Sequence, residues 1–221
     1  AGSAVRLMSC RTAILISGSG TNLQAFIDAV AAGDLDLDLC VVFSNKPDAY
    51  GLERAKKAGI PTACTEHGGF PDRESFDRAV IETLDEYAPD LLILAGFMRI
   101  LSPAFVEHYA GKILNIHPAL LPRFPGLNTH QRALDAGDEW HGSTVHFVTE
   151  ELDGGPRILQ GRLRIDPDET ADELQSRVQT IEHKIYPEAA GLVGSGRVLF
   201  RDGKTLVDGE VAEEPFIQSY E

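Results

Sequence analysis

Strand-like runs that alternate with helix-like segments constrain the fold of this chain of 221 residues more than any other feature. In the first half, short apolar runs are followed by turns and then by residues with helical spacing. Strands are therefore expected at 12–17, 39–43, 61–64, 91–95 and 113–116, and helices at 23–32, 52–58 and 75–87. This alternation predicts a Rossmann-like α/β fold, in which helices flank a mostly parallel central sheet.

The second half of the chain has a different pattern. Residues 144–149 and 157–165 read as half-exposed strands on either side of an Asp153-Gly154-Gly155 turn, which predicts an antiparallel extension at the sheet edge. A helix is expected at 174–186, where Pro187 should end it, and a hairpin at 198–207. Since no repeat or linker is visible, we expect a single domain.

Composition narrows the possible partners. The net charge of −14 argues against nucleic-acid binding, which needs clustered Lys and Arg, but it leaves small anionic ligands possible. No apolar run approaches the roughly 20 residues of a membrane span. The three cysteines are widely spaced and odd in number, which favours free buried thiols in a reducing compartment. We therefore expect a cytoplasmic protein.

Three candidate segments follow predicted strands, at 18–22, 96–101 and 115–118. Ligands of parallel α/β sheets bind outside the carboxyl ends of the strands. Because all three segments should meet at that edge of the sheet, we expect the functional site there.

The first segment, Gly18-Ser19-Gly20-Thr21-Asn22, opens a predicted helix. Free N–H groups and the positive end of the helix dipole favour a phosphate at such a position. The spacing fits neither a Walker loop nor a full Rossmann fingerprint. The alternative is a tight strand-to-helix turn in which Asn22 caps the helix.

The second segment, Gly96-Phe97-Met98-Arg99-Ile100-Leu101, places one arginine among apolar residues. This composition suits a flat heteroaromatic ligand with an acidic tail. The alternative is a loop that covers the core while Arg99 extends to water.

The third segment, Asn115-Ile116-His117-Pro118, ends a buried strand, and Asp153 follows later in the chain. Side chains two apart on a strand point the same way, so Asn115 and His117 should share one site. A nearby Asp would hold the imidazole protonated. An amide donor, an imidazolium and a carboxylate suit the stabilisation of an oxyanion, as in acyl or formyl transfer without a covalent intermediate.

Other reaction types find less support. His141 and His146 are five residues apart, so on one strand they should face opposite sides, and no third ligand at a metal-like spacing accompanies them. We expect no metal site. Ser17 and Ser19 lack the turn motif of a serine nucleophile.

Six long segments, in order, resemble one family: ISGSGTNLQA at 16–25, VFSNKPDAYGLERAKKAGI at 42–60, APDLLILAGFMRILSPAFV at 88–106, KILNIHPALLPRFPG at 112–126, HGSTVHFVTEELDGGPRILQ at 141–160 and RVQTIEHKIYP at 177–187. Together they resemble the folate-dependent phosphoribosylglycinamide formyltransferases of purine synthesis, over residues 11 to 190 approximately. Residues 166–172 and the tail after 190 match no pattern of that family.

The resemblance implies transfer of the formyl group of 10-formyltetrahydrofolate, a co-substrate, to the amine of 5′-phosphoribosylglycinamide, without a metal. Asn115 and protonated His117 would stabilise the oxyanion, and Asp153 would keep His117 protonated. The residues implied to bind the ribonucleotide are Gly20, Thr21, Asn22, Gln179 and Glu182. The residues implied to bind the folate are Arg73, Met98, Arg99, Ile100, Leu101, Thr149, Glu150, Glu151 and Leu152.

The resemblance also implies a single formyltransferase domain over 1–221, with residues 1–10 flexible. Its phosphate-binding half would lie at about 11–110 and its folate-binding and catalytic half at about 111–221. We expect a monomer or a homodimer, for which an apolar face on the 75–87 helix offers a surface.

Three alternatives stay open. Methionyl-tRNA formyltransferase has a basic C-terminal tRNA-binding domain, whereas about 30 residues follow residue 190 here. Formyltetrahydrofolate hydrolase is expected to carry an N-terminal regulatory domain, for which a first strand at about residue 12 leaves no room. A non-catalytic folate- or nucleotide-binding module would not need the Asn115, His117 and Asp153 set.

Overall fold

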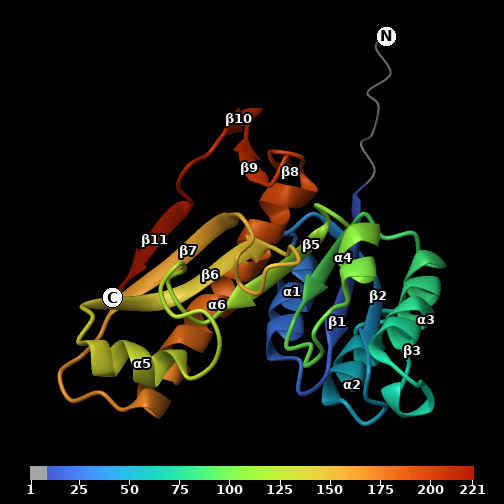
Figure 1. The fold of residues 1–221 in the computed structure, drawn as a ribbon, viewed down its shortest axis with the longest axis horizontal. Coiled ribbons are helices and arrows are strands. Elements are labelled where there is room, and N and C mark those ends of the chain that lie inside the picture. The colour runs from blue at the N-terminus through green and yellow to red at the C-terminus, as the bar shows by residue number, and fades with distance from the viewer. Residues whose placement is uncertain (1–8) are drawn as a thin grey trace.

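The computed structural model describes residues 9–221, which form an eight-stranded sheet and a small three-stranded sheet (Figure 1). The strand order of the large sheet is β11-β7-β6-β5-β4-β1-β2-β3. Its strands are β1 (Cys10–Ile16), β2 (Leu37–Ser44), β3 (Thr62–Cys64), β4 (Leu91–Leu94), β5 (Ile113–His117), β6 (Trp140–Phe147), β7 (Arg157–Arg164) and β11 (Phe216–Tyr220).

The large sheet is mostly parallel, as predicted. Strands β1 to β5 pair in parallel, whereas β6 runs antiparallel to both β5 and β7. The antiparallel extension is thus confirmed, although β7 is not the edge of the sheet. β11 pairs in parallel with β7 and forms the outer strand at the left of Figure 1. The sequence pattern did not predict β11.

Helices cover both faces of the sheet. Those the structure describes are α1 (Thr21–Ala31), α2 (Tyr50–Lys57), α3 (Arg73–Asp85), α4 (Pro103–His108), α5 (Thr129–Ala136) and α6 (Ala171–Gly194), with a short 3-10 turn at His67–Gly69. α1, α2 and α6 pack into one hydrophobic cluster, and α3 and α4 pack into another. Alternate residues of β1 divide between the clusters, since Ile14 belongs to the first and Leu15 to the second.

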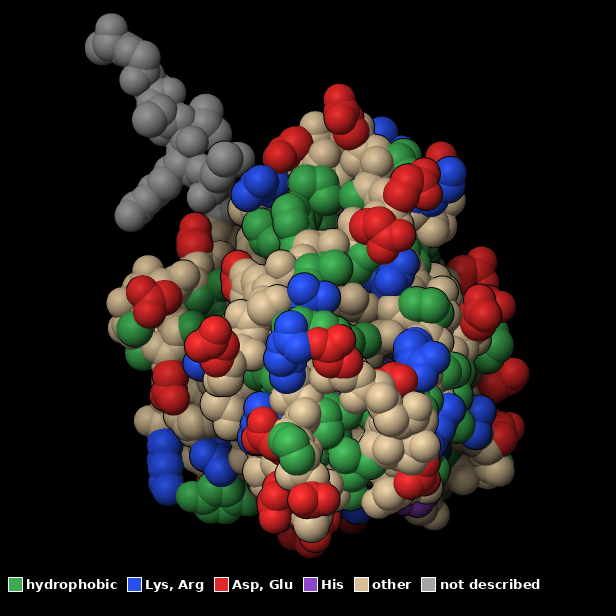
Figure 2. All heavy atoms as spheres, turned by 90° about the vertical axis from the view of Figure 1, so that its left-hand side faces the viewer, with side chains coloured by type: hydrophobic (Ala, Val, Ile, Leu, Met, Phe, Trp, Pro, Cys, Tyr) green, Lys and Arg blue, Asp and Glu red, His purple; other side chains and the backbone are tan. Residues whose placement is uncertain are grey.

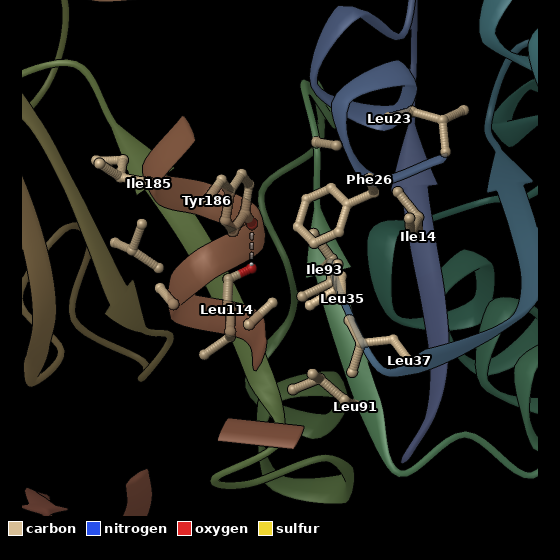
Figure 3. Packing of buried hydrophobic residues seen from close by; sticks show 14 of the residues in the cluster. Ile14, Leu23, Phe26, Leu35, Leu37, Leu91, Ile93, Leu114, Ile185 and Tyr186 are labelled. Carbon is tan, nitrogen blue, oxygen red and sulfur yellow. Dashed lines mark hydrogen bonds between the residues drawn. The ribbon is translucent and has the colours of Figure 1, made fainter. Parts of the chain in front are cut away.

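Tyr186 of α6 joins the helix to the centre of the sheet. Its ring packs edge-on against Phe26 of α1, with centroids 5.2 Å apart. Its hydroxyl is 3.0 Å from the backbone oxygen of Leu114 on β5 (Figure 3) and 2.6 Å from that of Leu94 on β4, and it donates to one of them. α6 is thereby held against β4 and β5, the strands that lead into two of the candidate segments.

The prediction that a helix ends at Pro187 is wrong, because α6 continues through Pro187 to Gly194. A proline inside a helix removes one hydrogen bond and costs about 3 kcal/mol. Pro187, Ala189 and Ala190 are buried against the core, and this packing offsets that cost. Tertiary contact therefore overrides the local stop signal.

The C-terminal hairpin is confirmed. β8 (Val198–Arg201) pairs with β9 (Lys204–Val207), and β10 (Glu210–Val211) adds a third strand. Asp202 and Gly203 at the turn have φ values of 51° and 73°, which suits an Asp-Gly hairpin turn. β6 begins at Trp140 and ends at Phe147, so the expected strand at 144–149 is displaced toward the N-terminus.

The termini and surface complete the fold. Cys10 already belongs to β1, while residues 1–8 of the expected flexible segment lie outside the described residues. Within residues 9–221, no helix has the length and apolarity that a membrane span requires. Cys10, Cys40 and Cys64 are free, but only Cys40 is buried as expected, because Cys10 is half-buried and Cys64 is exposed. On the face shown in Figure 2, acidic side chains lie among the basic ones.

Candidate functional site

Hydrogen bonds tie together the loops that follow β1, β2 and β4. The Ser17 hydroxyl donates to Asn45 Oδ1 at 2.6 Å and accepts from the Met98 amide at 2.8 Å. Ser17 and Asn45 are both buried. This chain of bonds fixes the 96–101 loop relative to the 18–22 loop, so the two expected ligand segments share one rigid edge of the sheet.

A cleft of about 360 Å³ opens beside these loops. It contains eight of the nine residues expected to bind folate, together with Asn115 and Asp153. Sequence reasoning missed six further lining residues. These are Leu94, Phe97, Pro103, Val106, His146 and Val148. Helix α4 supplies Pro103 and Val106, and the Ser102-Pro103 start signal could have revealed that helix, since Ser102 caps it.

His117 is not among the residues that line the cleft, but it lies next to Asp153, which is. His117 Nδ1 lies 3.6 Å from Asp153 Oδ1, and both side chains are 8% exposed. On its other side, His117 Nε2 donates to the Phe124 carbonyl oxygen at 2.8 Å. Both ring nitrogens therefore face acceptors, an arrangement that a doubly protonated imidazole satisfies. Asp153 Oδ2 also accepts from the Gly126 amide at 2.9 Å, which orients the carboxylate.

Asn115 lies on the same strand face as His117 and lines the cleft. Its amide Nδ2 is 3.5 Å from His146 Nε2. His146 Nδ1 donates to the backbone oxygen of Phe147 at 2.9 Å, which leaves Nε2 as the acceptor. Burial lowers the pKa of His146, so its neutral form is favoured. Neutral His146 thus helps to orient the Asn115 amide.

Residues 118–126 form the loop that carries Phe124 and Gly126 to this centre. Thr144 Oγ1 donates to Ala119 O at 2.7 Å and accepts from the Leu121 amide at 3.1 Å. Gln160 Nε2 donates to Leu121 O at 2.7 Å. The Leu121–Pro122 bond is cis. Buried donors on β6 and β7 therefore fix this loop from behind.

The 18–22 loop leads into α1 as expected. Gly20 is the residue before the helix, with φ of 76°, and no side chain caps the helix start. Asn22 is therefore not the cap, and its Oδ1 is buried without a partner among the described residues. Within residues 9–221, the amides of Ser19, Gly20, Thr21 and Asn22 donate no hydrogen bonds. Free amides at a helix start suit an anion.

The remaining expected residues lie outside the cleft. Arg73 is exposed at the start of α3, one turn from Phe76, whose ring lies 4.9 Å from the Arg99 guanidinium. On α6, Gln179 is exposed, whereas Glu182 is buried and accepts from the Ser143 hydroxyl at 3.1 Å. Burial raises the pKa of Glu182 to about 7, which the Ser143 hydrogen bond partly counteracts.

Metal ligation was not expected at this site. Among residues 9–221, no group of three or more His, Cys, Asp or Glu side chains could hold a metal ion.

Comparison with known proteins places these features in context. A model of the formyl transferase family matches residues 10–190. The phosphoribosylglycinamide formyltransferase of Escherichia coli is 53% identical over 197 residues, which cover 89% of this chain and 93% of that protein. A human trifunctional purine biosynthetic protein is 47% identical over 88% of this chain and 19% of its own length. The solved phosphoribosylglycinamide formyltransferase of Coxiella burnetii is 47% identical, with a TM-score of 0.90 over 95% of this chain and 99% of that one.

Proposed function

Because this chain belongs to the phosphoribosylglycinamide formyltransferases of the formyl transferase family, we propose that it formylates the amine of 5′-phosphoribosylglycinamide. The formyl donor is 10-formyltetrahydrofolate, and the reaction is a step of purine biosynthesis. The observation that carries this proposal is that Asn115 and Asp153 line a cleft together with eight of the expected folate residues, while His117 lies 3.6 Å from Asp153.

The acceptor amine attacks the formyl carbon directly, and negative charge develops on the formyl oxygen. Asn115 Nδ2 and the His117 imidazolium donate to that oxygen. Asp153, 3.6 Å from His117, stabilises the positive ring. Because Phe124 O occupies His117 Nε2 and Asp153 faces Nδ1, one of these contacts must give way before the ring reaches the substrate.

The tetrahedral intermediate then collapses. The bond between the formyl carbon and N10 of the folate breaks, while the new carbon–nitrogen bond to the glycinamide remains. A proton leaves the incoming amine and reaches the folate nitrogen through water. The products are the formylated ribonucleotide and tetrahydrofolate, so no redox cofactor or metal is required.

We assign residues to the two ligands from the positions of those residues in the fold. The free amides of Gly20, Thr21 and Asn22 support a phosphate site at the start of α1. We assign Gln179 and Glu182 to the remainder of the ribonucleotide. The folate takes the cleft, where Met98, Ile100 and Leu152 present exposed apolar side chains. Arg99 and Arg73 attract its acidic tail.

Organisation and location are part of the same proposal. The chain acts as one domain whose cleft joins the two expected halves, since its lining comes from residues 94–106 and from 115–153. It is a monomer or a homodimer and acts on small molecules. We place it in the cytoplasm on account of its free cysteines.

The test is loss of formyl from a 10-formylfolate, followed by absorbance with and without 5′-phosphoribosylglycinamide. The proposal predicts rapid loss only when the acceptor amine is present. Rapid loss without the acceptor would establish a hydrolase instead. Binding of both ligands without any loss of formyl would establish a binding module.

A further inference from the structure

Helix α2 holds two successive carbonyl groups of the 18–22 loop. The Gly51 amide donates to Gly18 O at 3.0 Å. The Arg54 guanidinium Nε donates to Ser19 O at 2.7 Å, and its Nη1 donates to Gln24 Oε1 on α1 at 3.2 Å. Arg54 therefore connects α2, the loop and the first turns of α1, although sequence analysis gave it no role.

These two bonds determine where the loop amides point. In a trans peptide, the carbonyl and the N–H of the next residue point in opposite directions. Since Gly18 O and Ser19 O both point toward α2, the amides of Ser19 and Gly20 point away from it. Those amides donate no hydrogen bonds within residues 9–221, so they remain available to an anion.

Close packing keeps α2 in this position. A methyl group added to Gly20 would lie 2.8 Å from Gly51 Cα, and one added to Gly51 would lie 2.3 Å from Ile16 Cδ1. The Arg54 guanidinium also lies 4.9 Å from the centre of the Tyr50 ring, which holds the cation beside the loop. The hydrogen bonds of Gly51 and Arg54 to the loop carbonyl groups, which we call the clamp, are thus part of the folded protein itself.

We propose that Arg54 is a positioning residue of the phosphate site, which orients the Ser19–Gly20 peptide so that the enzyme favours phosphorylated over unphosphorylated acceptors. This inference rests on the proposed function, because it assigns the 18–22 loop to the phosphate of the acceptor. Arg54 acts through the loop backbone, and its positive charge contributes in addition.

Three variants distinguish the effect of the hydrogen bond from Arg54 to Ser19 O from the effect of the positive charge of Arg54. Arg54→Met removes both the donor and the charge at similar length. Arg54→Gln retains an N–H donor at the position of Nε but removes the charge. Lys56→Met is the matched control, since Lys56 lies on the same helix and, within residues 9–221, pairs only with Glu53, at 3.3 Å, on an exposed surface.

Each variant is assayed with 5′-phosphoribosylglycinamide and with the same acceptor lacking its phosphate. For Arg54→Met we expect kcat/KM to fall about tenfold or more with the phosphorylated acceptor only, the effect of one charge-assisted hydrogen bond. The KM for formyl folate should not change. Arg54→Gln should retain most of the activity, and Lys56→Met should match wild type.

Several outcomes would overturn the inference. The first is an unchanged kcat/KM of Arg54→Met with the phosphorylated acceptor, and the second is an equal loss of kcat/KM with both acceptors. The third is a loss of kcat/KM in Lys56→Met as large as that in Arg54→Met. A defect in Arg54→Gln as large as that in Arg54→Met would assign the effect to charge and refute the clamp.

Binding of ribose 5-phosphate, followed by calorimetry, keeps this test independent of turnover. Arg54→Met should weaken that binding about tenfold, and unchanged binding would refute the role of Arg54. If wild type binds ribose 5-phosphate through Arg54 but transfers no formyl group, the proposed function fails while the phosphate-site inference stands.

Discussion

At the scale of single residues, polar groups lie on both faces of β5. On one face, Asn115 lines the cleft and His117 lies next to Asp153. Behind the strand, the Ser143 hydroxyl is 2.8 Å from His117 O and 3.1 Å from Glu182 Oε2. Glu182 is thus a buried carboxyl group linked to the backbone of His117. Its protonation is the residue-level property that responds most directly to pH.

Glu182→Gln should therefore change the pH dependence of stability. The pKa of Glu182 is raised to about 7 in the folded protein, whereas the unfolded chain has an ordinary value. The folded state keeps a proton that the unfolded state loses, so wild type loses stability as pH rises between those values. The gain in Glu182→Gln should grow by at most about 3 kcal/mol from about pH 5 to about pH 8.

Urea unfolding of both proteins at the two pH values measures this difference. A gain that is equal at both would show that Glu182 does not titrate in this window. Ser143→Ala is a useful companion, because removal of its hydrogen bond should raise the pKa of Glu182 further.

At the scale of elements, the sequence predicts those helices and strands whose formation depends on the local pattern of residues. The runs that form β1, β2, β4 and β5 are apolar because both faces of the sheet are covered, and their continuous apolar character identified them. Other elements depend on contacts that lie far apart in the chain. β11 exists because β7 offers an open edge, and α6 passes Pro187 because its C-terminal half is buried.

The contact between helix α5 and strand β6 leads to a second prediction about the pH dependence of stability. Its His130 Nδ1 is 3.0 Å from His141 Nε2 on β6, so one ring donates to the other. Burial and then His130 lower the pKa of His141 to about 4. Protonation favours the unfolded state, so wild type loses stability as pH falls from about 6.5 to about 4, by roughly 3 kcal/mol.

Hydrogen exchange of the α5 amides across that range measures the effect. The protection factors of the α5 amides, which correct for the pH dependence of intrinsic exchange, should fall on acidification in wild type and change less in His141→Gln, which cannot take up the proton. The exposed His108→Ala serves as the matched control. An equal fall in His141→Gln and wild type would contradict this account.

At the scale of the whole molecule, the site is built from loops that are distant in sequence. The Ser17 hydroxyl accepts a hydrogen bond from the Met98 amide. His117 on β5 lies next to Asp153, which belongs to the loop between β6 and β7. Sequence reasoning named ten of the residues that line the cleft, because they lie in recognisable segments, and missed six others. It did not find Ser17, Asn45 or Arg54 as supporting residues, because their roles arise from hydrogen bonds between loops rather than from a pattern.

The central claim is that His117 stabilises the oxyanion of formyl transfer. The most direct measurement is turnover of His117→Ala with both ligands shown to bind, and with His108→Ala as the control. We predict that binding persists while turnover falls on the order of 100- to 1000-fold or more. Turnover near that of wild type would contradict the account.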